Sequence, residues 1–166
     1  MRPKPNCPGI YSFRRDALTE LRRIIFICIT LGLIVMPLAG CVASYIYYPE
    51  RDIRLTPHSV GLVYADVTLE TADRVTINAW WVPAHRPRAT VLFCHGNGGK
   101  ISYYLETLKV FNRLGLCALI FDYRGYGRSR GVPTEQGTYR DARAAYEVAR
   151  SRYADADNPP VIVMGR

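Results

Sequence analysis

The sequence predicts an α/β fold in which an antiparallel hairpin precedes a parallel sheet with crossover helices. Two early segments, 63–70 and 75–82, alternate apolar and polar residues, whereas three later segments are short, continuous apolar runs. Alternation is typical of a strand with one buried face, and a continuous run is typical of a strand buried on both faces. Segments with helical spacing separate the later runs, and this order favours a parallel sheet with right-handed crossovers.

The hairpin comes first along the chain. Its two strands are joined by the turn residues Ala72, Asp73 and Arg74. The residues that would share one side of the hairpin are Val67, Leu69, Val75, Ile77, Ala79 and Trp81. This period of two predicts an antiparallel pair that covers one face of a core.

A strand, a helix and a second strand are expected next. The run 90–94 predicts a buried strand, and the run 116–121 predicts another. Between them, Gly115 is placed as a helix C-terminal cap. The residues that recur at helical spacing are Ile101, Tyr104, Leu108 and Phe111. We therefore expect one crossover helix before Gly115.

A second helix and a third buried strand complete the pattern. Thr138 and Asp141 are spaced like a capping box at the start of the helix. One helix face is marked by Tyr139, Ala142, Tyr146, Ala149 and Tyr153. The apolar run 161–164 predicts the third parallel strand. That strand would present a hydrophobic edge, which predicts poor stability for this chain in isolation.

Charge and cysteine content exclude several classes of function. The net charge is +8, and half of the excess precedes Ile24, where targeting signals carry positive charge. The remaining charge forms no basic stripe, which argues against nucleic-acid binding. The five cysteines show no CxxC spacing, and neither a metal-ligand cluster nor a phosphate-binding glycine motif is present. We therefore expect no metal and no cofactor.

The N-terminal segment 1–45 has the pattern of a targeting sequence, and 46–166 forms the domain. Arg22 and Arg23 precede an apolar run from Ile24 to Val35, and Leu38-Ala39-Gly40-Cys41 follows it. A basic region, an apolar region and small residues before a cleavage site indicate a secretory signal. The last four residues resemble the lipobox of bacterial lipoproteins, in which Cys41 would be lipidated. An uncleaved transmembrane anchor is the alternative. Both interpretations attach the domain to the membrane on its extracytoplasmic side.

The loops that follow the parallel strands are the candidate functional loops, because ligands bind beyond the carboxyl ends of such strands. The first is His95-Gly96-Asn97-Gly98-Gly99, whose glycines would let backbone N–H groups approach a substrate. The second runs from Asp122 to Ser129. Asp122 at a strand end is either catalytic or structural. We favour the structural role, in which Asp122 and Arg124 hold the glycine-kinked loop. Ser129 is interpreted as a turn residue.

Three motifs in this order resemble the α/β-hydrolase superfamily, and within it the membrane-associated serine aminopeptidase-like or esterase-like hydrolases. They are His95-Gly96-Asn97-Gly98-Gly99, Phe121-Asp122-Tyr123-Arg124-Gly125-Tyr126-Gly127 and the segment Pro133 to Ala142. The resemblance covers about Tyr48 to Arg166. It implies that Asn97 donates one backbone N–H of the oxyanion hole. His95, Gly96, Gly98, Asp122, Arg124 and Gly125 would then be structural residues of the site loops.

The resemblance also implies where the nucleophile should lie. Val161-Ile162-Val163-Met164-Gly165-Arg166 matches the strand and the first two positions of a Gly-x-Ser-x-Gly elbow. The nucleophilic serine is expected immediately after Arg166, and the acid and base would follow later. On this interpretation the chain is a truncated N-terminal part of the enzyme and is inactive alone, because acyl transfer needs an activated nucleophile.

The leading functional hypothesis is therefore a membrane-attached serine hydrolase that acts on ester, thioester or amide bonds of a small acyl or peptide substrate. Alternatives are a non-catalytic lipoprotein or scaffold built on a partial hydrolase domain, and an anchor carrying a degenerate domain. Tyr103, Tyr123 and Tyr126, interpreted as exposed, would line an acyl-binding surface or pack at its rim. His58 and His85 match no motif and are expected on the surface.

Overall fold

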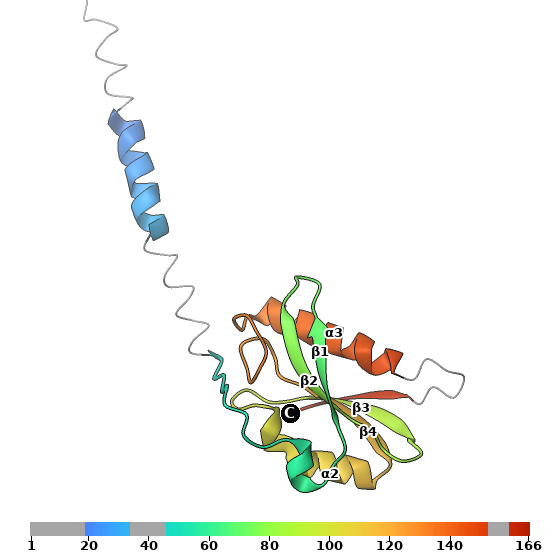
Figure 1. Cartoon of the computed structure of the whole chain (residues 1–166). Coiled ribbons are helices and arrows are strands. Elements are labelled where there is room, and N and C mark those ends of the chain that lie inside the picture. Colours follow the sequence, from blue (N-terminus) through green and yellow to red (C-terminus); the bar gives the residue numbers. More distant parts are fainter. Residues whose placement is uncertain (1–18, 34–45, 153–159) are drawn as a thin grey trace, which may run out of the picture. The chain divides into compact units, whose positions relative to one another are not determined.

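The computed structural model describes residues 19–33, 46–152 and 160–166. The chain divides into two compact units, Met1–Ser44 and Tyr45–Arg166. The first unit contains the helical residues 19–33, drawn in blue in Figure 1. The second unit contains the sheet and its two packed helices (Figure 1).

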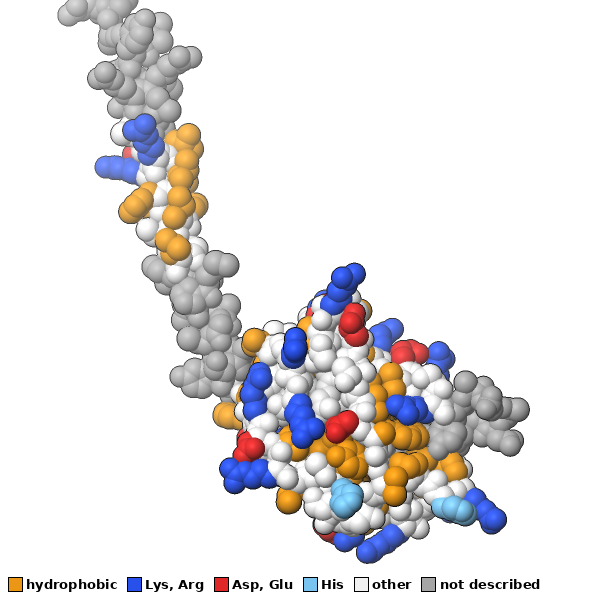
Figure 2. All heavy atoms as spheres, in the orientation of Figure 1, with side chains coloured by type: hydrophobic (Ala, Val, Ile, Leu, Met, Phe, Trp, Pro, Cys, Tyr) orange, Lys and Arg blue, Asp and Glu red, His pale blue; other side chains and the backbone are white. Residues whose placement is uncertain are grey.

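The helix of the first unit displays its apolar side chains on its surface. Figure 2 shows hydrophobic side chains along this helix, and Ile24, Phe26 and Leu33 are each more than half exposed. Among the described residues, no helix combines the length and the apolar character that crossing a membrane requires. Cys41 and its Leu-Ala-Gly context lie outside the described residues.

In the described part of the second unit, five strands form one sheet in the order β1-β2-β4-β3-β5. Strands β1 (Ala65–Glu70) and β2 (Thr76–Val82) pair antiparallel, which confirms the predicted hairpin. Strand β2 then pairs antiparallel with β4 (Leu116–Phe121). The hairpin therefore forms one side of the sheet. The candidate functional loops follow the strands β3, β4 and β5 on the other side.

The remaining pairs are parallel, as the continuous apolar runs predict. Strand β3 (Ala89–Cys94) lies between β4 and β5 (Val161–Gly165) and is parallel to both. The pairing aligns Cys94 with Phe121 on one side and with Gly165 on the other. The carboxyl ends of the three parallel strands consequently lie level with one another.

Two helices cover opposite faces of the sheet. A 3₁₀ turn, η2 (Ile101–Tyr104), leads into α2 (Leu105–Arg113), and Gly115 follows with a positive φ of 71°. Leu105, Leu108 and Phe111 of α2 pack with Trp80 and other residues of one sheet face. Helix α3 (Glu135–Ser151) packs on the other face (Figure 1). A further 3₁₀ turn, η1 (Pro57–Val60), precedes β1. The core is thus two apolar layers, one on each side of the sheet.

The predicted start of the second helix was wrong, and its predicted face was right only at Ala142 and Ala149, while Tyr153 lies outside the described residues. Thr134, not Thr138, is the N-cap of α3, and its hydroxyl accepts a hydrogen bond from the Gly137 N–H at 3.1 Å. The buried face consists of Gly137, Asp141, Ala145 and Ala149, whereas Tyr139 and Tyr146 are exposed. Small side chains let the helix approach the sheet closely, so the buried stripe follows the alanines and not the tyrosines.

Candidate active site

The site loops meet at the level carboxyl ends of β3, β4 and β5. The Arg166 N–H donates to the Cys94 carbonyl at 3.2 Å, so Arg166 continues the pairing beyond the strand. A Cβ atom added to Gly96 would lie 3.3 Å from the Arg166 carbonyl oxygen. The absence of a side chain at Gly96 therefore allows the backbone after β5 to run directly beside the His95–Gly99 loop.

Asn97 is the tip of this loop, between Gly96 and Gly98. Gly98 and Gly99 have φ values of 90° and 108°, a backbone conformation that glycine adopts without strain. The Asn97 backbone N–H donates to no group in the described part of the chain. Gly96, the residue before it, lies beside Arg166, so this N–H belongs to the loop that runs along the end of β5. An N–H without an internal partner in such a loop is a candidate oxyanion donor.

His95 lies below this tip as a buried residue with 4% of its surface exposed. Its Nδ1 donates to the Gly96 carbonyl at 2.8 Å, which assigns the proton of the neutral ring to Nδ1. Its ring contacts Tyr126 at a centroid distance of 5.3 Å. Burial lowers the pKa of His95. A neutral imidazole that holds its own loop has the structural role that the resemblance implies.

Asp122 faces His95 from the end of β4, and both side chains are fully buried. The Asp122 Oδ1 atom lies 3.8 Å from His95 Nε2, beyond hydrogen-bonding distance. Burial raises the pKa of Asp122 to about 7, although the nearby N–H groups of Ile101 and Arg128 oppose the shift. Because burial also lowers the pKa of His95, both shifts act against an ion pair. The two groups form a buried pair in which neither charge is stabilised by the other.

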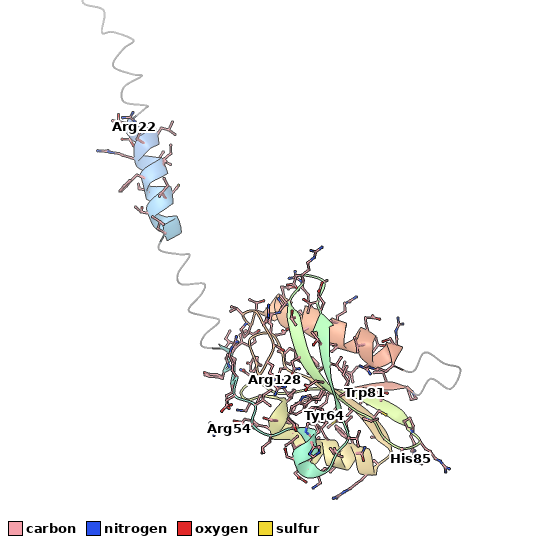
Figure 3. All side chains as sticks on the ribbon, viewed as in Figure 1. Arg22, Arg54, Tyr64, Trp81, His85 and Arg128 are labelled. Atoms are coloured by element: carbon pink, nitrogen blue, oxygen red, sulfur yellow. The ribbon has the colours of Figure 1, made fainter. Side chains whose placement is uncertain are left out.

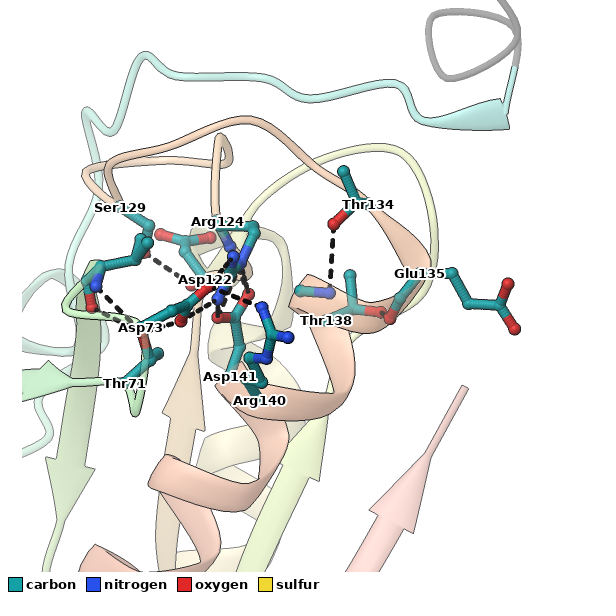
Figure 4. A network of polar contacts seen from close by, with 12 residues as sticks. Thr71, Asp73, Asp122, Arg124, Ser129, Thr134, Glu135, Thr138, Arg140 and Asp141 are labelled. Carbon is teal, nitrogen blue, oxygen red and sulfur yellow. Dashed lines mark hydrogen bonds and ion pairs between the residues drawn. The ribbon is translucent and has the colours of Figure 1, made fainter. Parts of the chain in front are cut away.

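Arg124 holds the loop after β4 through carboxylates of other elements and not through Asp122. Its guanidinium donates to Asp141 at 2.8 Å and to Asp73 at 2.8 Å, as Figure 4 shows. The Arg124 backbone N–H also donates to Asp141, at 2.9 Å. These contacts join the β1–β2 turn, the loop after β4 and helix α3. Asp73 and Asp141 were missed as partners because they lie far from Arg124 in the sequence.

Ser129 is buried, with 1% of its surface exposed. Its hydroxyl donates to the Asp122 carbonyl at 2.6 Å and accepts from the Asn78 N–H at 2.9 Å (Figure 4). Both hydrogen bonds join the loop to β2 and β4. The hydroxyl is therefore committed to backbone groups, as a turn residue and not as a nucleophile.

A cavity of about 210 Å³ opens beside the Asn97 tip. Its wall contains Tyr47, Tyr123, Tyr126 and Tyr139, together with His95, Gly96, Asn97, Thr138 and Ala142. Tyr123 and Tyr126 thus belong to the wall, but neither is exposed as predicted, since Tyr126 is buried and Tyr123 is partly buried. Tyr103 lies in a separate surface depression with Glu50 and Lys100. Tyr47 and Tyr139 are wall residues that the sequence did not reveal.

The two remaining histidines lie away from this site. His58 belongs to η1 and His85 to the loop between β2 and β3, and both are exposed. Figure 3 labels the side chain of His85. Both histidines are surface residues, as predicted. No group of three or more His, Cys, Asp or Glu that could hold a metal was found in the residues the structure describes.

Comparison with known proteins agrees with the fold. Residues 85–166 match the family model described as serine aminopeptidase, S33. The chain is 33% identical over 147 residues to the α/β hydrolase domain-containing protein WAV2 of Arabidopsis thaliana, covering 81% of this chain and 47% of that protein. The chain belongs to the α/β-hydrolase superfamily.

Other proteins are similar over shorter or more divergent stretches. An uncharacterized membrane protein of Saccharomyces cerevisiae is 39% identical over 88 residues, which cover 52% of this chain and 31% of that protein. An esterase of Pyrococcus furiosus superposes with a TM-score of 0.60 at 24% identity, covering 72% of this chain and 46% of the esterase. The chain spans about half the length of the curated relatives it matches. In α/β-hydrolases, the described loops belong to the face where catalysis occurs.

Proposed function

We propose that the protein containing this chain is a membrane-attached serine hydrolase that acts on an ester, thioester or amide bond. The observation that carries the proposal is the unengaged N–H of Asn97, in the loop whose preceding residue, Gly96, lies beside Arg166. A nucleophile placed directly after Arg166 would stand next to this donor. The tetrahedral oxyanion formed on attack would then be stabilised where its charge develops.

The nucleophile in this proposal is a serine that follows Arg166 in the complete coding region. Gly165 and Arg166 fit the first two positions of the Gly-x-Ser-x-Gly elbow, and an added Cβ at Gly165 would meet nothing within 4 Å. The acid and base would be supplied by later residues. The 166 residues alone would then bind substrate weakly and would not turn it over.

The cavity beside Asn97 supports an uncharged acyl group as the part of the substrate bound there. Four of its nine lining residues are tyrosines, and burial lowers the pKa of its one imidazole, which favours the neutral form. Its volume of about 210 Å³ corresponds to a small group, because pockets for drug-sized ligands start near 300 Å³. A small acyl or peptide carbonyl substrate fits these walls.

Membrane attachment is part of the proposal and rests on the N-terminal segment. The helix at residues 19–33 exposes its apolar side chains, and Arg22 and Arg23 precede most of them. One similar protein carries the name of a membrane protein. Lipidation at Cys41 or a single anchor would then hold the domain on the extracytoplasmic side.

The first test is the intact mass of the native protein solubilised from membranes of the source cell. A mass well above that of 166 residues, with serine directly after Arg166, is the expected result. A mass matching Cys41 to Arg166 with acyl groups, or another residue after Arg166, would overturn the catalytic proposal and favour a non-catalytic lipoprotein.

The second test is labelling of the full-length protein by a fluorophosphonate, which reacts with activated serines. Labelling should map to the residue after Arg166 and should disappear when that serine is replaced by alanine. Ser129→Ala is the matched control, because its hydroxyl is committed to backbone groups, and it should be labelled like the native protein. Labelling that vanishes with Ser129→Ala and survives the other change would contradict the proposed nucleophile.

A further inference from the structure

The side chain of Asn97 is held from two directions. Its Oδ1 accepts from the Tyr126 hydroxyl at 2.7 Å and from the Tyr48 N–H at 3.2 Å. Its Nδ2 donates to the Ile46 carbonyl. Glycines flank Asn97, and the loop is held at Gly96 by the His95 ring and at Gly99 by the bridge to Pro49. The carboxamide adds a restraint on Asn97 itself, and through it on the direction of the Asn97 N–H.

Tyr126 reaches this carboxamide from a firmly held loop. Only 2% of its surface is exposed, and its ring packs against the edge of His95. Its backbone N–H donates to the Tyr123 carbonyl at 2.9 Å, and the next N–H, of Gly127, donates to the Glu50 carbonyl at 2.7 Å. The hydroxyl thus occupies a fixed point below the tip of the His95–Gly99 loop.

The second direction comes from residues 46–50, which we call the strap. Pro49 forms a β-bridge with Gly99, and the Glu50 carboxylate accepts from Lys100 at 3.1 Å and from the Tyr103 hydroxyl. Tyr47 of the strap lines the cavity. The strap therefore links both site loops and meets Tyr126 at the Asn97 carboxamide.

We propose that Tyr126 is a positioning residue that acts through the Asn97 carboxamide, with the strap, to aim the Asn97 backbone N–H at the oxyanion. This inference rests on the proposed hydrolase function. Loss of an oxyanion donor typically costs about 10²–10³ in rate. If the donor remains but points less accurately at the oxyanion, the rate falls by a smaller factor. Because the interaction develops in the transition state, the loss falls on kcat and not on KM.

The test uses Tyr126→Phe in the full-length protein, which keeps the ring and removes the hydroxyl. We expect kcat to fall about tenfold with KM nearly unchanged, when rates are normalised to the fraction of protein labelled by fluorophosphonate. The inhibition constant of a trifluoromethyl ketone, whose adduct carries the oxyanion, should rise by the same factor. Tyr146→Phe, on the exposed side of α3, should change neither value. A normal kcat and inhibition constant in Tyr126→Phe would overturn the inference.

A double-mutant cycle tests the route through Asn97. Asn97→Ala keeps the backbone N–H and removes the carboxamide, so its loss should match or exceed that of Tyr126→Phe. Adding Tyr126→Phe to Asn97→Ala should then cost less than twofold more, because the hydroxyl has lost its partner. Multiplicative losses would show that Tyr126 acts independently of Asn97 and would overturn the inference.

Amide hydrogen exchange separates this inference from the proposed function. The Tyr48 N–H is protected by the Asn97 carboxamide, so its exchange should be several-fold faster in Tyr126→Phe and unchanged in Tyr146→Phe. If the native protein is not labelled by fluorophosphonate, the hydrolase proposal fails, and exchange still decides whether Tyr126 holds the loop. Unchanged exchange at Tyr48 would overturn the positioning role whether or not the protein is an enzyme.

Discussion

Two buried carboxylates have opposite surroundings: Asp122, which directly follows β4, and Asp141, in helix α3. Asp141 accepts three contacts from the Arg124 side chain and one from the Arg124 backbone. Asp122 has no guanidinium or ammonium group bonded to it in the described chain, and its Oδ1 lies 3.8 Å from the His95 ring. The charges of Arg128 and Lys100 lower its pKa without reversing the rise that burial causes. One carboxylate is compensated and the other is not.

The two carboxylates hold different parts of the molecule. Asp141 pairs with Arg124, which also pairs with Asp73, so this group joins α3 to the loop after β4 and to the β1–β2 turn. The uncompensated group lies under the His95–Gly99 loop, where its Oδ1 accepts from the Ile101 N–H at 2.9 Å. Uncompensated polar groups are typical of functional sites, whereas structural clusters satisfy theirs. Each of the following predictions alters one side of this comparison.

The largest effect is expected when the compensated side is broken. Arg124→Met leaves the Asp141 carboxylate buried without its cation, and such a change typically costs about 3–5 kcal/mol of unfolding free energy. Urea denaturation of the full-length protein measures it. Arg140→Met is the matched control, because Arg140 contacts Asp73 at 3.0 Å but is half exposed. The Arg140→Met variant should lose much less unfolding free energy than Arg124→Met. Equal losses would show that burial of Asp141 does not determine the cost.

The next effect comes from crowding the uncompensated side. Gly127 has a φ of 45°, and an added Cβ would overlap the Asp122 carboxylate. Gly98 also has a positive φ, of 90°, but a Cβ there would meet nothing within 4 Å. Gly127→Ala and Gly98→Ala therefore share backbone strain and differ in overpacking, which costs about 1–3 kcal/mol. Thermal unfolding should show Gly127→Ala as the less stable variant. Identical unfolding temperatures would refute the predicted overlap.

Ser129→Ala tests how the uncompensated side is attached to the sheet. Removing the hydroxyl leaves the Asn78 N–H and the Asp122 carbonyl without their partner, and a buried unsatisfied polar group typically costs about 1–3 kcal/mol. A water molecule that enters the site would replace part of the lost hydrogen bonding. We therefore expect a destabilisation near the lower end of this range, about 1 kcal/mol. Ser151→Ala, at the exposed end of α3, is the control and should be nearly neutral in denaturant unfolding. A neutral Ser129→Ala would show that the loop is held by other contacts.

The sequence predicted the scaffold better than it predicted these contacts. Period-two and continuous apolar runs identified the hairpin and the three parallel strands, because burial of a strand depends on its own side chains. The ends of those strands then placed His95, Asn97 and Asp122 together. The partners of Arg124 could not be found in this way, because Asp73 is 51 residues away and pairs only after the hairpin has docked.

The same distinction explains the wrong face of α3 and the missed role of the strap. Tyrosines at helical spacing suggested a buried stripe, but Ala145 and Ala149 allow the close approach to the sheet that the fold selects. Ile46 and Tyr48 contact Asn97 through their backbone atoms. Any residue type can make such a contact through its backbone, so no pattern in the sequence could have indicated these contacts.

The smallest expected effect is the pH dependence of stability that Asp122 produces. Burial raises its pKa to about 7 from the usual 3.8, so between these values the folded state binds more protons than the unfolded state. The stability that this group contributes is present below pH 4 and is lost as the pH rises through 7. Asp122→Asn does not titrate and should lack this slope. Its stability relative to the native protein should therefore improve between pH 5 and pH 8, on the order of 1 kcal/mol after relaxation of the site.

His95 also titrates near this window and remains in the variant. Burial lowers its pKa, so this group destabilises the folded state as the pH falls. Arg124 and Thr71 hold the pKa of Asp73 well below its usual 3.8, so its contribution changes only at pH values below the window. Subtracting the Asp122→Asn curve from the native curve cancels these contributions to first order. Parallel curves in urea denaturation from pH 5 to pH 8 would show that Asp122 is already ionised at pH 5. Its charge would then be compensated in the folded protein, and the contrast with Asp141 would be wrong.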